Sequence, residues 1–174
     1  MKKNNTRQMV QIASLSAISI VFFAFAFRVI PGIPLKADLS DFPVMIAAYT
    51  MGPMAGVMVA LLKNIIHALF LSSDGSIIGE IANFAFAVFI MLPISIIKDD
   101  DKKKNILILF LGLFIAAALM HIFNYYVTFP LYGMPSEGKS DLLLSVFLPF
   151  NLVKGLILYV LFILSRPYFD RIHR

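Results

Sequence analysis

Long apolar runs, separated by short polar segments or by Pro and Gly, make up almost the whole chain. Several runs approach the roughly 20 residues that a helix needs to cross a bilayer, and none alternates like a barrel strand. The runs and their interruptions predict six helices, at residues 8–30, 42–51, 54–71, 78–97, 105–130 and 142–166. The pattern therefore predicts an all-α polytopic membrane protein in which residues 1–174 form a single transmembrane domain.

The second predicted helix is too short to cross a bilayer of ordinary thickness. At about 1.5 Å per residue, residues 42–51 reach half of a roughly 30 Å hydrocarbon core. Ser40 or Asp41 is expected to cap this helix, and Pro43 suits its first turn. The preceding loop, 31–41, is expected to fill the thin region that the short helix leaves.

The distribution of Lys and Arg indicates that the second helix does cross. If it crosses, the basic residues concentrate on the side of both termini, as the positive-inside rule expects, and otherwise this bias disappears. That side then holds Lys2, Lys3, Arg7, Lys98, Lys102, Lys103, Lys104, Arg166, Arg171 and Arg174, and the other side holds Arg28, Lys36 and Lys139. We therefore expect six membrane spans in a bacterial plasma membrane, with both termini cytoplasmic.

Composition supports the membrane assignment and narrows the chemistry. The chain is 60% hydrophobic with a mean hydropathy of +0.87, which is more apolar than a soluble domain. The net charge of +5 does not indicate a nucleic-acid partner, because the basic residues flank the predicted spans. The sequence contains no Cys, which excludes disulfides and thiol chemistry.

Four of the predicted helices carry polar side chains that are costly inside a membrane. One charge at a helix centre costs about 2.5–3.5 kcal/mol. Within each helix most of these groups are spaced i, i+3 or i, i+4, so they share one face. The four faces are therefore expected to meet around a cavity open to the outside. The groups are Lys63, Asn64 and His67, then Glu80 and Asn83, then His121, Asn124 and Thr128, and finally Asn151 and Lys154.

Some of these groups have a structural interpretation. Asn and His often join helices within membranes, and we favour that role for His67 and His121. An ion pair between Lys63 and Glu80 would be equally consistent with structural neutralisation and with a place in a binding site.

Lys154 and Asn151 are better explained by a ligand. Lys154 has no acidic residue on its own helix face, and Asn151 lies on the same face. Carboxamides both donate and accept hydrogen bonds, so they suit the edge of a heterocycle with carbonyl and imide-type N–H groups. A neutral or anionic heterocycle is therefore the expected ligand.

One motif is expected to be a chance match. Residues 133–140, GMPSEGKS, fit the G-x-x-x-x-G-K-[ST] pattern of phosphate-binding loops. That loop requires a buried strand before it and a helix after it, whereas here a predicted membrane helix precedes it. No acid–base pair, zinc-ligand spacing or nucleophile motif is recognisable, so we expect neither catalytic residues nor a metal site.

Ala13 and Ala17 form a small-xxx-small pattern in the first predicted helix. Such a pattern lets another helix approach closely. The spacing alone leaves open whether that helix belongs to a partner or to this chain.

Four blocks of sequence, taken in order, resemble one transporter family. They are LKADLSDFPVMIAAYTMGPMAGVMVALLKNIIHAL at 35–69, GEIANF at 79–84, NYYVTFPLYG at 124–133 and PFNLVKG at 149–155. From residue 8 to about residue 166 the chain resembles the riboflavin-specific S component of energy-coupling factor (ECF) transporters. The resemblance implies a six-helix substrate-binding membrane protein that works with a transmembrane T component and two cytoplasmic ATPases. It also implies that the loop after the first helix caps a vitamin pocket on the outer side.

The resemblance further implies residues that bind the vitamin and the partner. Asn151 and Lys154 would hold the pyrimidine-like edge of the flavin ring, and Ala13 and Ala17 would face the T component. The other implied vitamin-binding residues are Lys36, Asp38 and Leu39 in the capping loop, and Lys63, Glu80, Asn83, Asn124 and Thr128. The apolar plane of a flavin ring would in addition suit aromatic walls such as Phe84 and Tyr125.

We therefore expect a riboflavin uptake component that binds the vitamin from outside, needs no cofactor and hydrolyses nothing itself. ATP hydrolysis by the partners would reorient the subunit and release the vitamin inside. Two alternatives remain open. One is the same fold with another vitamin, such as flavin mononucleotide, pantothenate or biotin, and the other is a small intramembrane enzyme or sensor that uses Glu80 and His121.

Overall fold

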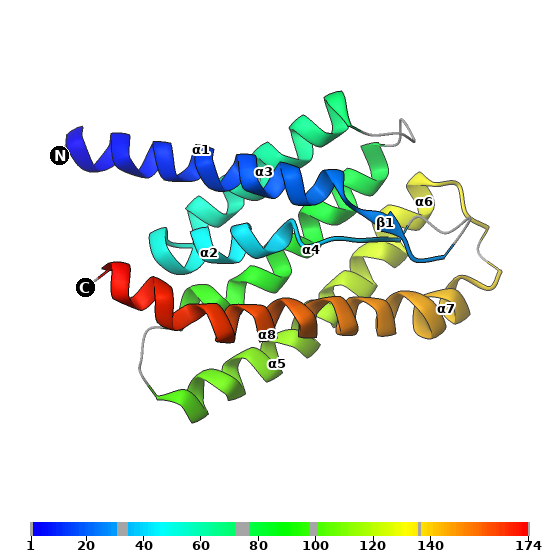
Figure 1. The fold of residues 1–174 in the computed structure, drawn as a ribbon. Coiled ribbons are helices and arrows are strands. Elements are labelled where there is room, and N and C mark those ends of the chain that lie inside the picture. Colours follow the sequence, from blue (N-terminus) through cyan, green and yellow to red (C-terminus); the bar gives the residue numbers. More distant parts are fainter. Residues whose placement is uncertain (1, 31–34, 72–76, 98–100, 136, 174) are drawn as a thin grey trace.

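The computed structural model describes residues 2–30, 35–71, 77–97, 101–135 and 137–173. These residues form a bundle of helices with one two-residue hairpin (Figure 1). The all-α fold expected from the apolar runs is confirmed. The predicted turn at 72–76, residues 31–34 of the expected capping loop and Lys98 lie outside the described residues.

Helices follow one another with short connections, and two of the long helices contain a π-helical turn, named η1 and η2. Because η1 joins α5 to α6 without a break, and η2 joins α7 to α8, each set forms one continuous helical segment. The elements in order are α1 (Lys2–Ala24), β1 (Phe27–Arg28), β2 (Lys36–Ala37), α2 (Asp41–Met51), α3 (Pro53–Phe70), α4 (Ile77–Ile96), α5 (Lys102–Phe123), η1 (Asn124–Thr128), α6 (Phe129–Leu131), α7 (Lys139–Leu142), η2 (Leu143–Phe147) and α8 (Leu148–His173).

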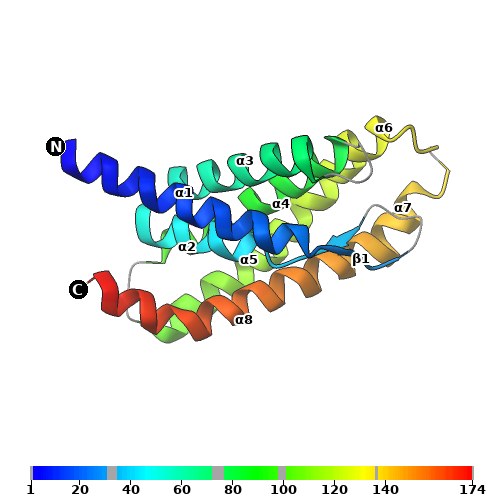
Figure 2. The ribbon, with the colours of Figure 1, turned by 45° about the horizontal axis from the view of Figure 1, so that its top comes forward.

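Among the described residues, five helical segments are long and apolar enough to cross a membrane. They are Thr6–Ala24, Pro53–Phe70, Ile77–Ile96, Lys102–Leu131 and Lys139–Arg171. The sixth helix, α2, has 11 residues and is roughly 16 Å long at 1.5 Å per residue. Because α2 packs against α1 and α3 and runs back along them, both chain termini lie at one end of the bundle, while β1, α6 and α7 lie at the other (Figures 1 and 2).

The first helix ends earlier, and the last one later, than the apolar runs predict. The first run continues to Ile30, but α1 stops at Ala24 because β1, which follows, pairs with β2 in an antiparallel hairpin. The last helix was expected to end at Arg166, yet α8 continues to His173. The early end of α1 places the hairpin at the end of the bundle away from the termini.

Ser40 is the N-cap residue of α2, as the sequence predicts, but the side-chain hydrogen bond expected of a cap is absent. The Ser40 hydroxyl donates to Asp38 and accepts from Lys63 Nζ, and the Asp41 carboxylate also binds Lys63. The polar residues at the start of α2 therefore serve tertiary contacts rather than the helix end.

The π turns stand just before prolines. Pro130 follows η1, and Pro149 follows η2 at the same spacing. Proline lacks an N–H, and in an α-helix its ring clashes with the carbonyl four residues earlier. In η1 the backbone N–H of Phe129 donates to the carbonyl of Asn124, five residues back, which is the π-helical register. The turn carries Asn124 and Thr128, so it lies within the candidate site described below.

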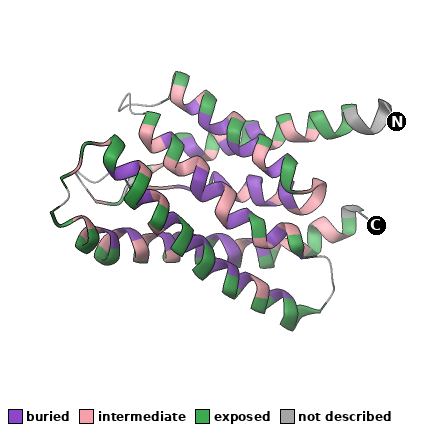
Figure 3. Cartoon of the chain, turned by 180° about the vertical axis from the view of Figure 1, so that it is seen from behind, coloured by how far each residue is buried: buried purple, intermediate pink, exposed green. Residues whose placement is uncertain are grey.

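The core lies between the inner faces of the helices. Buried residues turn inward and exposed residues cover the outside (Figure 3). A Cβ added to Gly56 would lie 2.5 Å from Met91 Sδ and 2.9 Å from Ala48 Cβ, so only glycine lets α2, α3 and α4 approach this closely. On the outside, α5 exposes large apolar side chains such as Phe110 and Phe114, as contact with lipid requires.

Candidate functional site

A cavity that we call the polar cavity lies between α1, β2, α4, η1 and α8, toward the hairpin end of the bundle. Polar residues of α4, η1 and α8 face one another across it, so the polar stripes of these helices do meet. The cavity is narrow, because the centre of a water molecule can occupy only about 60 Å³ of it. Its lining residues are Phe23, Leu35, Lys36, Gly79, Ala82, Asn83, Phe86, Met120, Asn124, Thr128, Tyr132, Phe147, Phe150, Asn151 and Lys154.

Buried amide and hydroxyl groups of the polar cavity lack hydrogen-bond partners among the described residues. They are both side-chain polar atoms of Asn124, the hydroxyl of Thr128, Nδ2 of Asn151 and Oδ1 of Asn83. Asn124 is 1% exposed and Asn151 is 5% exposed. A buried polar group left unpaired costs about 1–3 kcal/mol, so this concentration of donors and acceptors is suited to a ligand that offers both.

The aromatic walls of the polar cavity differ from those that the sequence suggested. Phe23 of α1 and Phe86 of α4 line the cavity, together with Phe147 and Phe150 at the start of the last long helix. The expected walls Phe84 and Tyr125 do not line it, because each directly follows a cavity asparagine. Neighbouring residues in a helix point about 100° apart, so their side chains turn away from the cavity.

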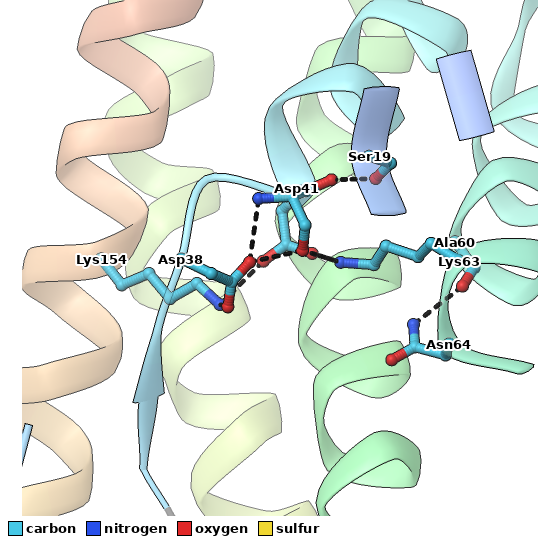
Figure 4. A network of polar contacts seen from close by, with 8 residues as sticks. Ser19, Asp38, Asp41, Ala60, Lys63, Asn64 and Lys154 are labelled. Carbon is cyan, nitrogen blue, oxygen red and sulfur yellow. Dashed lines mark hydrogen bonds and ion pairs between the residues drawn. The ribbon is translucent and has the colours of Figure 1, made fainter. Parts of the chain in front are cut away.

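Lys154 lies in a network of ion pairs at the inner edge of the polar cavity (Figure 4). Its Nζ atom is 3.1 Å from Asp38 Oδ2 and 2.9 Å from Asp41 Oδ2. It also lies 4.8 Å from the ring centroid of Phe86, which adds a cation–π contact. Lys154 has no acidic partner on its own helix face, as the sequence indicates, but it pairs with two acids from another segment of the chain.

The two carboxylates of this network come from the segment that enters α2. Asp41 also pairs with Lys63 from the opposite side, so two acids and two lysines neutralise one another. The backbone N–H of Ser40 donates to Asp38 Oδ1 at 2.9 Å, which holds the segment in a tight turn. The positive charge of Lys154 and the hydrogen bonds that Ser40 donates stabilise the carboxylate form of Asp38.

Glu80 belongs to a second network, and the Lys63–Glu80 pair considered from the sequence is not formed. Glu80 Oε1 lies 2.9 Å from His67 Nδ1 and 3.9 Å from Lys36 Nζ. The His67 ring stacks on Phe23, with ring centroids 3.8 Å apart. His67 thus joins α1, α3 and α4, which agrees with the expected role between helices, whereas the role expected for His121 stays a prediction.

A second, more apolar cavity adjoins the first between the hairpin, the end of α1 and α8. Its volume is about 430 Å³, and Phe150 and Lys154 line both cavities. Asp38 and Leu39, which the sequence assigned to a capping loop, line this second cavity. Phe150 therefore forms part of the wall between the two spaces.

The remaining predicted residues lie outside both cavities. Lys63 and Glu80 line neither cavity. Glu80 pairs with Lys36, which lines the polar cavity, and Lys63 pairs with Asp41, which in turn pairs with the cavity residue Lys154. Ala13 and Ala17 are exposed on α1. The segment that resembles a phosphate-binding loop follows helix α6 rather than a strand, as its interpretation as a chance match requires.

Sequence and structure comparisons identify the family. Residues 7–166 match the family described as "ECF transporter, substrate-specific component". The chain therefore belongs to the substrate-specific components of ECF transporters.

Similar proteins include the riboflavin transporter RibU of Staphylococcus aureus (strain TCH60), 35% identical over 168 residues that cover 91% of this chain and 87% of that protein. The riboflavin transporter FmnP of Bacillus subtilis (strain 168) is 33% identical over 168 residues, covering 90% and 88%. A solved structure described as "Structure and mechanism of the S component of a bacterial ECF transporter" has a TM-score of 0.81 at 34% identity, covering 98% of this chain and 99% of that chain.

Membership of this family decides between the classes of function left open by the sequence. The chain is a component of a membrane transporter and not an enzyme, so the alternative of an intramembrane enzyme or sensor is set aside. The apolar helices agree with a multi-pass membrane protein.

Proposed function

We propose that this chain captures riboflavin at the outer face of a bacterial plasma membrane and delivers it inward together with a T component and two ATPase subunits. The observation that carries the proposal is the polar cavity, in which Asn124, Thr128 and Asn151 have polar atoms without a partner among the described residues, next to aromatic walls. The names of the similar transporters RibU and FmnP support riboflavin as the vitamin. No observation favours pantothenate or biotin.

Riboflavin combines an apolar ring plane, a polar ring edge and a polyol tail, and the polar cavity offers a match for each. Phe86 and Phe147 would contact the ring plane, and the amides of Asn124 and Asn151 would pair with its polar edge. Because the cavity is narrow, binding requires side chains such as Phe150 to shift toward the adjoining second cavity.

Lys154 keeps a ligand-binding role in this proposal, although its charge is already paired with two carboxylates. An ammonium group has three N–H donors. Two are directed at Asp38 and Asp41, so the third is available to a carbonyl of the flavin ring. The carboxylates would thus fix the position of Lys154, while Lys36, Asp38, Leu39, Lys63, Glu80 and Asn83 would complete or support the site.

Titration of riboflavin with the purified protein tests this function. We expect quenching of flavin fluorescence that saturates at one riboflavin per chain, because stacking on aromatic rings quenches the excited flavin. Flavin mononucleotide, added as a competitor, should displace bound riboflavin more weakly than riboflavin itself does. Pantothenate or biotin should not displace it. Folded, monodisperse protein that leaves the fluorescence unchanged would refute the assignment.

We further propose that both termini are cytoplasmic. The supporting observations are that the termini share one end of the bundle and that the basic residues concentrate there, in the first turn of α5 and the last turns of α8. This orientation places the polar cavity near the outer face.

Ala13 and Ala17 would contact the T component in this proposal. Both are exposed on α1, where a small surface lets a partner helix approach closely. Replacing both with Trp should abolish co-purification with a T component and leave the affinity for riboflavin unchanged. Ala118, an exposed alanine of α5, provides the control, and its replacement with Trp should leave co-purification intact. Equal losses in the two variants would place the interface elsewhere.

A further inference from the structure

A third cavity, which we call the basal pocket, lies near the chain termini between the first turns of α5 and the last turns of α8. Its volume is about 320 Å³. Lys102 and Arg166 lie on its polar side, and Ile106, Leu109 and Phe162 form apolar walls. Among the residues that the structure describes, this pocket shares no lining residue with the polar cavity or with the second cavity.

Along the axis of α5, the basal pocket is polar at one end and apolar at the other. Lys102 is the first residue of a segment that is long and apolar enough to cross a membrane, so we expect its ammonium group at the level of the lipid headgroups. Leu109 is seven residues further along α5, about 10 Å deeper at 1.5 Å per residue. Ile106, between them, is 57% exposed, so the pocket opens toward the lipid.

Among the described residues that line the basal pocket, two are basic and one is acidic. Arg166 Nε donates to the hydroxyl of Tyr49 at 3.0 Å and lies 3.4 Å from Asp170 Oδ2. The Tyr49 hydroxyl in turn donates to Asp170 Oδ1 at 2.5 Å. These contacts hold Arg166 in place, and Asp170 is the acidic residue among the described residues that line the pocket. An anion in the pocket would thus lie close to two cationic side chains, Lys102 and Arg166.

We propose that the basal pocket binds an anionic phospholipid. Its phosphodiester would lie between Lys102 and Arg166, and the start of one acyl chain would follow Ile106 and Leu109 along α5. Basic pockets between transmembrane helices are suited to anionic headgroups. A free phosphate ion would use the charges but leave the apolar walls without contact, so the combined chemistry favours a lipid.

Native mass spectrometry of the purified full chain tests the proposal with phosphatidylglycerol and phosphatidylcholine as probes. We expect one phosphatidylglycerol retained per chain in preference to phosphatidylcholine. Lys102→Glu should weaken this retention about tenfold, since each basic group near a headgroup contributes about a fivefold factor and reversal also adds repulsion. Lys103→Glu makes the same charge change one residue away, outside the pocket, and should have little effect. Equal losses in both variants would indicate diffuse surface attraction and overturn the proposal.

An uncharged pair of variants tests the apolar walls independently. Ile106→Trp should fill the pocket and abolish preferential retention, whereas Leu107→Trp, at a position 56% exposed and outside the pocket, should preserve it. Excess inorganic phosphate should not displace the lipid. Displacement of the lipid by phosphate would overturn the proposal. The proposal would also fail if the Ile106→Trp variant lost a co-purified protein partner but retained the lipid.

Discussion

Replacing Asn151 with leucine should lower the affinity for riboflavin roughly 30-fold while leaving the thermal stability of the protein unchanged or higher. Leucine has nearly the shape of asparagine but cannot hydrogen-bond, so the ligand's polar edge would lose a partner at a cost of about 2 kcal/mol. Without ligand, Asn151 Nδ2 is buried and has no partner among the described residues, so the substitution removes the free-energy cost of burying an unpaired donor. The opposite signs for binding and stability distinguish a ligand contact from a packing residue.

Asn64→Leu is the matched control for this experiment. Asn64 is also 5% exposed and lies on a helix of the same bundle, but it lines neither the polar cavity nor the second cavity. Its Nδ2 donates to the carbonyl of Ala60 at 2.8 Å, so its amide serves its own helix. Fluorescence titration should therefore give wild-type affinity for Asn64→Leu. Wild-type affinity in Asn151→Leu as well would remove Asn151 from the site.

Replacing Asp41 with asparagine should destabilise the protein by about 3–5 kcal/mol, the cost typical of breaking a buried ion pair. Asp41 and Lys63 are both fully buried, and Asp41 also pairs with Lys154. The variant would leave one carboxylate, Asp38, between two buried ammonium groups. For a chain of this size the loss corresponds to a fall in Tm of roughly 6–20 °C. The fraction that remains monodisperse in size-exclusion chromatography after heating measures it.

Lys63→Met in the Asp41→Asn background should restore part of the lost stability. The second change removes the unpaired ammonium and leaves Asp38 and Lys154 as a neutral pair, so the double-mutant cycle should show coupling above ~1 kcal/mol. Asp170→Asn is the control, since the Arg166–Asp170 pair is partly exposed and should contribute less than about 1 kcal/mol. A double variant that is less stable than the sum of the single changes would contradict the network.

Local spacing along the chain determined the fold class and part of the candidate site. Apolar runs of membrane-crossing length require helices, because lipid cannot satisfy the backbone of any open structure. The i, i+3 spacing of Asn151 and Lys154 and the i, i+4 spacing of Asn124 and Thr128 put each pair on one helix face. Both pairs line the polar cavity, so the sequence indicated the right faces without knowledge of the contacts between helices.

Contacts between segments far apart in the chain decided the rest. Asp38 lies 116 residues before Lys154, and no periodicity within α8 indicates that an acid from the loop before α2 reaches it. The same holds for Lys63, which pairs with Asp41 rather than with Glu80. Ion pairs depend on which helices become neighbours and on the depth at which their side chains meet, and neither is a property of one helix.

The sequence by itself determined the all-α class, the apolar exteriors of the helices and the faces that carry polar groups, because the length and the repeat of each helix fix these properties. Only the tertiary structure decided that the first helix ends at Ala24, since β1 finds its hydrogen bonds in β2 rather than in a continued helix. It also decided which aromatic rings wall the polar cavity and which acids hold Lys154, because packing between elements selects those partners.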